Sequence, residues 1–424
     1  MGGQQICMSS VSRMKKIMFE RTTASGGGRI GRLTTRRGVL TTPFFMPDAT
    51  RASVRGLSAS DIRETGVEAL VVNTYHLYLQ PGTDLIKKVR IEGVDPGGVH
   101  AFMGWDGPLL SDSGGYQIYS LIHKHAEMGK ITDEGVEFRS VLDGSKHLIT
   151  PERAIAIQFD LGTDMIVCLD DPRPNDASRE EITKAVDRTL RWAERCRAEY
   201  DRQCEVRGFG DSTRPLLFGV VQGGMYVDER RRCAAGLAAI GFDGYGFGGR
   251  HIDEEGNFLA DILAATADAI PENTPRFALG IGTPSDIVRC HALGWDMFDC
   301  VIPTREGRHG RLFLWTKPRI QNSKLQFPNQ VDPDLYRTIN IQNEQFKEDF
   351  SPVDPTCDCE LCTRHTPAYL KHLFKVADPL AGRLASTHNL RFYVRLMEVL
   401  RQGKGFDRQE VDSGVGVASK AVLG

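Results

Sequence analysis

Residues 217–224 read LFGVVQGG, an apolar run that ends in small and polar residues. Seven further runs of this kind occur along the chain, and longer stretches with helical signals separate them. Continuous apolar runs, unlike alternating ones, are typical of parallel strands that are buried on both faces. The seven other runs are 42–49, 70–76, 108–115, 164–171, 245–249, 277–282 and 297–304.

Helix signals lie between these runs. Pro151 opens one expected helix, Pro284 with Asp286 opens another, and the charged stretch 178–206 is long enough for a third. Eight strand-helix units over roughly 250 residues predict an α/β fold, a TIM (β/α)8 barrel, whose functional side chains lie at the C-terminal ends of the strands. A doubly wound open sheet is the alternative, but the glycine-rich dinucleotide turn that this fold usually carries is missing.

The composition changes at both ends of this pattern. Residues 1–28 are expected to form an N-terminal leader, because they mix Gly, Ser, Thr and Lys with little periodicity. Residues 29–310 are assigned to the barrel, 311–402 to a subdomain that contains the cysteine triplet CDCELC (357–362) and closing helices, and 403–424 to a flexible tail.

Bulk composition excludes several classes of protein. A formal charge of −2 over 424 residues argues against a protein that coats nucleic acid, while leaving room for a local basic patch. The chain has neither an apolar run long enough for a membrane span nor a signal peptide, so we expect a cytoplasmic protein without a membrane partner. Its ten cysteines are too scattered to suggest a disulfide framework.

Carboxylates follow several of the expected strands and are the first candidates for chemistry. Two of them across a pocket could act as nucleophile and general acid/base, as carboxyl groups about 5 to 5.5 Å apart do in retaining glycosyl transfer. A buried aspartate that caps a helix is the competing interpretation for any one of them. The candidates are Asp112, Asp170, Asp171 and Asp299.

Other strand ends carry groups that suit a planar base. Tyr116 offers an aromatic face beside two glycines, Asp170 and Gln222 offer hydrogen-bonding edges, and the backbone of Gly248 and Gly249 could donate to a carbonyl oxygen. A basic run from Arg305 to Arg319 follows Asp299 closely, where phosphates of an RNA could bind.

The triplet Cys357, Cys359 and Cys362 predicts a metal site, because three thiolates within six residues would repel each other without a cation. A structural zinc site needs a fourth ligand, and His365, His372 and His388 are candidates. We favour His388, since it is expected to open a helix that the metal could join to the cysteine loop.

Taken together, the motifs NTYHL, FMGWDGPLLSDSGGYQ, FGVVQGG, FDGYGFGG, MFDCVIPTREGRHG and CDCELC followed by His388 resemble those of the tRNA-guanine transglycosylases. The resemblance runs from about Gly31 to about Leu400. It implies a TIM barrel with a zinc subdomain inserted near the C-terminus, and exchange of the wobble guanine of tRNAs with GUN anticodons for a 7-deazaguanine in queuosine biosynthesis. It also implies a homodimer that binds the tRNA anticodon loop.

The resemblance assigns roles to single residues of this chain. Asp299 matches the nucleophile that forms a covalent bond to the ribose, and Asp112 matches the general acid/base. Arg305 and Arg308 match contacts to RNA phosphates. The base-binding positions are Ser113, Tyr116, Asp170, Gln222, Gly249, Leu279 and Glu254. The ligands of one structural Zn2+ per subunit are Cys357, Cys359, Cys362 and His388.

Two departures from the bacterial pattern concern the incoming base. Residues 250–253 read RHID in place of Leu-Ala-Val-Gly, and Pro172 replaces a frequent cysteine. The default base, 7-aminomethyl-7-deazaguanine, is a cation that Arg250 would oppose unless its side chain points away. Queuine or 7-cyano-7-deazaguanine as the base, a DNA-directed enzyme, and a non-catalytic partner subunit are the alternatives.

Overall fold

The computed structural model describes residues 18–22, 28–90, 97–316 and 335–402. An eight-stranded parallel sheet forms its centre, in the order β4-β14-β13-β12-β11-β10-β6-β5. A bridge between Asp48 and Val71 closes the sheet, with Ala49 N donating to Val71 O at 2.7 Å, so the predicted barrel is confirmed. The strands are β4 (Phe44–Pro47), β5 (Leu70–Val72), β6 (Leu109–Ser111), β10 (Met165–Val167), β11 (Leu216–Val221), β12 (Gly244–Phe247), β13 (Arg276–Ala278) and β14 (Met297–Cys300).

Alternate strand residues face the inside of the barrel, as the two-residue period of a strand requires. The interior cluster holds Phe44 and Met46 of β4, whereas Phe45 between them packs outward against the helices. The same alternation places Met297 inside and Phe298 outside. The next inward position on a strand therefore lies at the mouth of the barrel.

Helices surround the sheet, and capping residues mark the starts of several of them. Ser58 and Ser178 form capping boxes, while Thr150 and Thr283 cap helices that begin with a proline. The three helices predicted from the sequence start where expected. The α-helices of the barrel region are α1 (Ala59–Glu64), α2 (Thr74–Leu79), α3 (Thr83–Ile86), α4 (Val99–Met103), α5 (Gly115–Lys124), α6 (Pro151–Leu161), α7 (Arg179–Val206), α8 (Val227–Ile240), α9 (Ala260–Ala269), α10 (Pro284–Ala292) and α11 (Ile302–Arg308).

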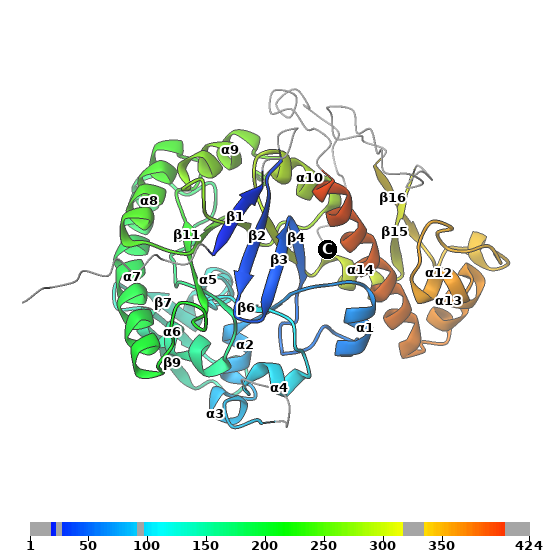
Figure 1. The fold of residues 1–424 in the computed structure, drawn as a ribbon, viewed down its shortest axis with the longest axis horizontal. Coiled ribbons are helices and arrows are strands. Elements are labelled where there is room, and N and C mark those ends of the chain that lie inside the picture. The colour runs from blue at the N-terminus through cyan, green and yellow to red at the C-terminus, as the bar shows by residue number, and fades with distance from the viewer. Residues whose placement is uncertain (1–17, 23–27, 91–96, 317–334, 403–424) are drawn as a thin grey trace, which may run out of the picture.

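Two small antiparallel sheets accompany the barrel. One inserts between α5 and α6 and consists of β7 (Gly129–Ile131), β8 (Val136–Arg139) and β9 (Lys146–Ile149). The other consists of β1 (Phe19–Thr22), β2 (Ile30–Thr35) and β3 (Gly38–Thr42), which cross one end of the barrel in Figure 1.

The sheet β1–β3 corrects the expectation of a leader over residues 1–28, because Phe19–Thr22 pairs with β2. Phe19 is buried in the interior cluster of the barrel, so this segment contributes to the core. Residues 1–17 and 23–27 of the expected leader lie outside the described residues. Arg36 after β2 donates to the buried Asp164 at 2.8 Å, which joins this sheet to the start of β10.

The chain after α11 forms a separate lobe beside the barrel, with α14 between the two (Figure 1). Its elements are β15 (Arg311–Trp315), β16 (Tyr336–Asn340), α12 (Glu360–Arg364), α13 (Pro367–Lys375) and α14 (Pro379–Arg401). Helix α14 packs on the barrel, where Tyr393 Oη donates to Gly282 O at 2.6 Å.

The expectation that His388 opens a helix is wrong. Asp378 caps α14 and Pro379 occupies its first turn, so His388 lies within the helix. The expected tail, 403–424, lies outside the described residues, as do Lys317 and Arg319 of the basic run. Within the described ranges, no helix is both long and apolar enough to cross a membrane.

Candidate active site and metal centre

Polar side chains form the layer above the apolar interior of the barrel, at the C-terminal ends of the strands. Asp112 lies two residues after the inward-facing Leu110, and Asp299 two residues after Met297. Gln222 follows Val220 and Leu279 follows Phe277 in the same way. The structure thus brings the two predicted catalytic carboxylates into one barrel mouth.

Asp112 is held by three donors from adjacent segments. Asn73 Nδ2 donates to its Oδ2 at 2.6 Å, and the backbone N–H groups of Thr74 and Gly114 donate to Oδ1 at 2.8 and 3.2 Å. Gly114 has a φ of +75° and lies against the backbone of Tyr75, so a side chain there would disturb this turn. Burial raises the pKa of Asp112 to about 7 against the effect of these hydrogen bonds.

Asp299 has a sparser set of partners. The backbone N–H of Gly280 donates to its Oδ1 at 2.7 Å. Burial raises the pKa of Asp299 to about 7, and the carboxylates of Asp48 and Asp112 contribute in the same direction. The pKa of each of these two carboxyl groups therefore lies near neutral pH, above the ordinary value of an aspartate.

Strands β10 and β11 carry two of the predicted base-binding residues at the mouth. Gln222 Nε2 donates to Asp170 Oδ2 at 2.7 Å, and both side chains are buried. Ser113, the residue after Asp112, is buried and accepts from Gly115 N at 3.2 Å. Burial raises the pKa of Asp170 to about 7. The Asp170–Gln222 pair can present a carboxyl and an amide to the edge of a purine-like ring.

Gly249 lies in the left-handed region with a φ of +107°, and a Cβ there would lie 3.4 Å from Arg230 Nη2. Leu279 is half-buried, whereas Tyr116, at the start of α5, exposes 58% of its surface. An exposed aromatic ring beside a polar mouth is available for stacking.

Arginines surround the mouth on the side of β4 and α11. Arg305 is exposed and Arg308 half-buried. Burial and the neighbouring guanidinium groups of Arg55 and Arg305 lower the pKa of Arg308. In the described parts of the chain, neither Arg55 nor Arg308 has a carboxylate within ion-pair distance, so this positive charge can bind phosphates.

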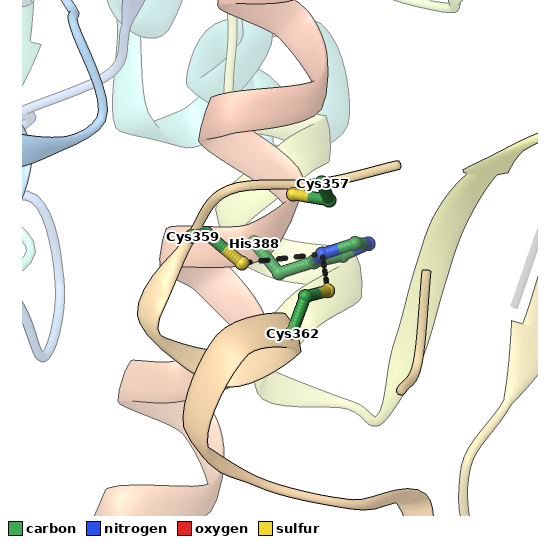
Figure 2. A group of neighbouring side chains, drawn as sticks. All are labelled: Cys357, Cys359, Cys362 and His388. Atoms are coloured by element: carbon green, nitrogen blue, oxygen red, sulfur yellow. Dashed lines mark hydrogen bonds between the residues drawn. The ribbon is translucent and has the colours of Figure 1, made fainter. Parts of the chain in front are cut away.

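The four predicted metal ligands converge in the lobe after the barrel (Figure 2). Their ligand atoms lie within 4.8 Å of one another and all four residues are buried. His388 Nδ1 lies 3.5 Å from Cys359 Sγ and 3.2 Å from Cys362 Sγ. A tetrahedral zinc ion with metal–sulfur bonds of about 2.3 Å holds its ligand atoms roughly 3.5 to 3.8 Å apart, so the cluster fits such an ion.

The orientation of His388 also suits a metal. Its Nε2 lies 2.8 Å from the backbone oxygen of Phe313 on β15, which leaves Nδ1 to face the thiols. A hydrogen bond of this kind fixes the ring of a metal-binding histidine. Among the described residues, His365 and His372 are not part of the cluster, and His365 stacks on Tyr369 instead.

Comparison with known proteins shows the family of the chain. The family model described as queuine tRNA-ribosyltransferase matches residues 24–403. The chain belongs to the queuine tRNA-ribosyltransferase family. A relative of that name from Thermoanaerobacter sp. (strain X514) is 40% identical over 90% of this chain and 91% of its own. Relatives with the same name from Desulforamulus reducens and Pseudoalteromonas translucida are 39% and 41% identical, over 93% and 90% of this chain and 95% and 91% of their own.

The family confirms the predicted enzyme class and the fold. Residues 250–253, which are expected to depart from the bacterial pattern, and Glu254 lie in the loop after β12. Arg250 Nη1 and Glu254 Oε1 form an exposed ion pair at 3.4 Å, and Asn175 Nδ2 donates to the backbone oxygens of Arg250 and Ile252 at 3.1 Å each. Glu254, predicted to bind the base, thus pairs with a cation of its own loop.

One polar residue of the mouth was absent from the predicted site. Asp48 follows β4 and is half-buried, and its carboxylate accepts from Thr50 Oγ1 at 2.7 Å. The alternation Phe44, Met46, Asp48 could have indicated its inward direction. The apolar run 42–49 is buried on both faces, however, so the inward face is not evident from the sequence.

Proposed function

We propose that this protein is a tRNA-guanine transglycosylase that exchanges the wobble guanine of tRNAs with GUN anticodons for a 7-deazaguanine, in queuosine biosynthesis. The observation that carries the proposal is the joint position of Asp112 and Asp299 in one barrel mouth, which also holds the Asp170–Gln222 pair. Two titratable carboxyl groups beside a polar, ring-sized recognition edge suit glycosyl transfer between purine-like bases.

In the first half of the reaction, an ionised Asp299 attacks C1′ of the ribose and the bond from C1′ to N9 of guanine breaks. Asp112 gives its proton to N9, so guanine leaves as a neutral molecule. The ribose is then bonded to Asp299 as an ester-like intermediate.

In the second half, Asp112 takes the proton from N9 of the incoming base, which attacks C1′ and releases Asp299. The two inversions retain the configuration at C1′. Neither step needs an external oxidant or a metal ion. The pKa values of about 7 for both carboxyl groups support this exchange of roles.

RNA binding is assigned to the arginines beside Asp299. Arg305 and Arg308 would contact phosphates of the anticodon loop, which follows from their place at the mouth and from the missing carboxylate partner of Arg308 among the described residues. The cluster of Cys357, Cys359, Cys362 and His388 would hold one structural Zn2+, which joins the cysteine loop and α12 to α14 and takes no part in the exchange.

We also propose a homodimer in which the second subunit helps to position the tRNA. The lobe that holds the metal cluster exposes Phe350 and Tyr369, of which 74% and 38% are accessible. Apolar side chains of this kind are common in subunit contacts. Light scattering coupled to gel filtration tests the stoichiometry, and a monomer at micromolar concentration would contradict it.

The incoming base is proposed to be 7-aminomethyl-7-deazaguanine. Its cationic substituent would approach the loop 250–254, where Arg250 already neutralises Glu254. Competition between 7-aminomethyl-7-deazaguanine, 7-cyano-7-deazaguanine and queuine for exchange against labelled guanine tests this choice. The variant Arg250→Ala should favour the cation, because Glu254 then lacks its partner.

The activity itself is tested with radiolabelled guanine and a tRNA with a GUN anticodon. We expect incorporation that depends on the wobble guanosine, and none into the same tRNA with adenosine at that position or into a DNA copy of the stem-loop. Failure of the folded, zinc-containing protein to incorporate guanine would contradict the proposal, and preferential incorporation into DNA would change the substrate class.

A further inference from the structure

Asp48 is a third carboxylate in the layer that holds Asp112 and Asp299. It follows Phe44 and Met46 at the two-residue spacing of inward-facing positions on β4. The chemistry proposed above gives it no role, because one nucleophile and one acid/base are sufficient. Its half-buried carboxylate nevertheless lies in the mouth, and burial of an ionised group costs free energy unless the group has hydrogen-bond partners.

The order of the strands places Asp48 between the two reacting groups. Strand β4 pairs with β14 on one side, with Met46 opposite Asp299, and meets β5 on the other through the Asp48–Val71 bridge. The residues that hold Asp112 directly follow β5. Asp48 accordingly contributes to raising the pKa of both Asp112 and Asp299.

The position of the base then determines what lies over Asp48. The base-binding candidates Asp170, Gln222 and Gly249 follow β10, β11 and β12, the three strands farthest from β4 around the closed barrel. If the base lies there and C1′ lies over Asp299, the sugar extends toward β4. Arg308, whose charge acts on Asp48, continues this direction toward the phosphates.

Asp48 has the capacity to bind a hydroxyl group. Thr50 is its hydrogen-bond partner in the described part of the chain, and a carboxylate can accept about four hydrogen bonds. Burial raises the pKa of Asp48, whereas Thr50, His76 and Arg308 act against this shift and favour the ionised, accepting form.

We propose that Asp48 accepts a hydrogen bond from the 2′-hydroxyl of the ribose undergoing exchange and so selects ribonucleotides over deoxyribonucleotides at that position. The inference rests on the proposed base exchange and adds the group that recognises the sugar. The 2′-hydroxyl is the substituent next to C1′, and hydrogen bonds to the corresponding hydroxyl in glycoside hydrolysis strengthen in the transition state. It is also the group that distinguishes RNA from DNA.

The test compares two RNA stem-loops that differ only at the exchanged guanosine, which carries ribose in one and 2′-deoxyribose in the other. We expect the wild-type enzyme to exchange guanine roughly 10- to 100-fold faster, as kcat/KM, in the ribose substrate, the range for a hydrogen bond to a charged group. In Asp48→Ala and Asp48→Asn, kcat/KM for the ribose substrate should fall toward the value for the deoxyribose substrate. In Asp48→Ala, the ratio of the two kcat/KM values should be at most about threefold.

The ratio of kcat/KM for the two substrates separates recognition of the 2′-hydroxyl from the electrostatic effect of Asp48 on the other carboxyl groups. Loss of a negative charge also changes the protonation of Asp112 and Asp299, but that effect acts on both substrates and cancels in the ratio. Equal slowing of both substrates by Asp48→Ala, or a wild-type enzyme that does not discriminate, would overturn the proposal. Asp84→Asn, an exposed carboxylate on α3, is the matched control and should keep the wild-type ratio.

The outcome also distinguishes this proposal from the proposed function. A wild-type protein that incorporates guanine into neither substrate contradicts the base exchange itself. Incorporation with an unchanged ratio in Asp48→Ala and Asp48→Asn contradicts only the role of Asp48. Zinc content and circular dichroism of each variant establish that the fold is retained.

Discussion

The side-chain amide of Asn73 donates a hydrogen bond of 2.6 Å to Oδ2 of Asp112. Asn73 Oδ1 also accepts from His76 N at 3.0 Å, so the cap of α2 fixes the orientation of the amide. The carboxylate that would shuttle the proton is therefore positioned by the turn after the neighbouring strand.

Asn73→Ala should lower kcat by about 10-fold with a smaller change in KM, because a misplaced acid/base impairs the chemical step more than binding. Removal of a donor to the charged form of Asp112 should also raise the apparent pKa of the alkaline limb of the pH profile, because Asp112 must be protonated when guanine leaves. Steady-state kinetics between pH 5.5 and 8.5 measure both effects. An Asn73→Ala variant with the kcat and pH profile of the wild type would show that Asp112 does not need the hydrogen bond from Asn73. The control is Asn257→Ala, at an exposed position.

The pH dependence of kcat/KM should be bell-shaped with a maximum near pH 7. The reaction needs one of the two carboxyl groups ionised and the other protonated, and the pKa of each lies at about 7. The rate should fall at low pH, where both are protonated, and at high pH, where both are ionised. A rate that is constant from pH 5.5 to 8.5 would contradict proton sharing by this pair.

Asp299→Asn should be more stable than the wild type at alkaline pH. The folded-state pKa of Asp299 lies above the unfolded value of 3.8, so its contribution to stability is present below about pH 4 and is lost as the pH rises through about 7. The shift corresponds to at most roughly 4 kcal/mol, and partial exposure reduces the expected gain to on the order of 1 to 2 kcal/mol at pH 8.5.

Urea unfolding at pH 5.5 and 8.5 measures this gain, which should be smaller at pH 5.5. Asp176→Asn, at an exposed position, should unfold like the wild type at both values. If Asp299→Asn is less stable than the wild type at pH 8.5, the claim that the ionised Asp299 destabilises the folded protein would be wrong.

Cys359→Ser should lose zinc and destabilise the lobe that packs through α14 on the barrel, since a hydroxyl group replaces one of four ligands. Metal analysis should find about one zinc per chain in the wild type and well under half of that in the variant. Cys204→Ser, on α7 and outside the cluster, should keep its zinc. Full zinc occupancy in Cys359→Ser would exclude this thiol as a ligand.

The barrel was predictable because each strand is an apolar run that ends in small or polar residues. The N-terminal sheet was not, since β1 is four residues long and buries only Phe19. Helix α14 starts before His388, because Asp378 caps it and Pro379 fits its first turn. His388 nevertheless reaches the thiols from the middle of that helix.

Some residues of the candidate site could also be predicted from the sequence, and others could not. Asp112, Asp170, Gln222 and Asp299 follow predicted strands, so barrel closure brings them to one mouth. The pairing of Glu254 with Arg250 and the inward position of Asp48 depend on side-chain direction and strand register. A sequence without a known register does not determine either of them.

The covalent bond between Asp299 and RNA is the central claim. An RNA stem-loop containing the exchangeable guanosine, incubated with the enzyme and denatured, tests it by intact-protein mass spectrometry and peptide mapping. We predict an adduct of enzyme with RNA lacking one guanine, attached at Asp299, present in the wild type and missing in Asp299→Asn with its fold and zinc retained. An adduct of wild-type yield in Asp299→Asn, or one mapped to another residue, would contradict the account.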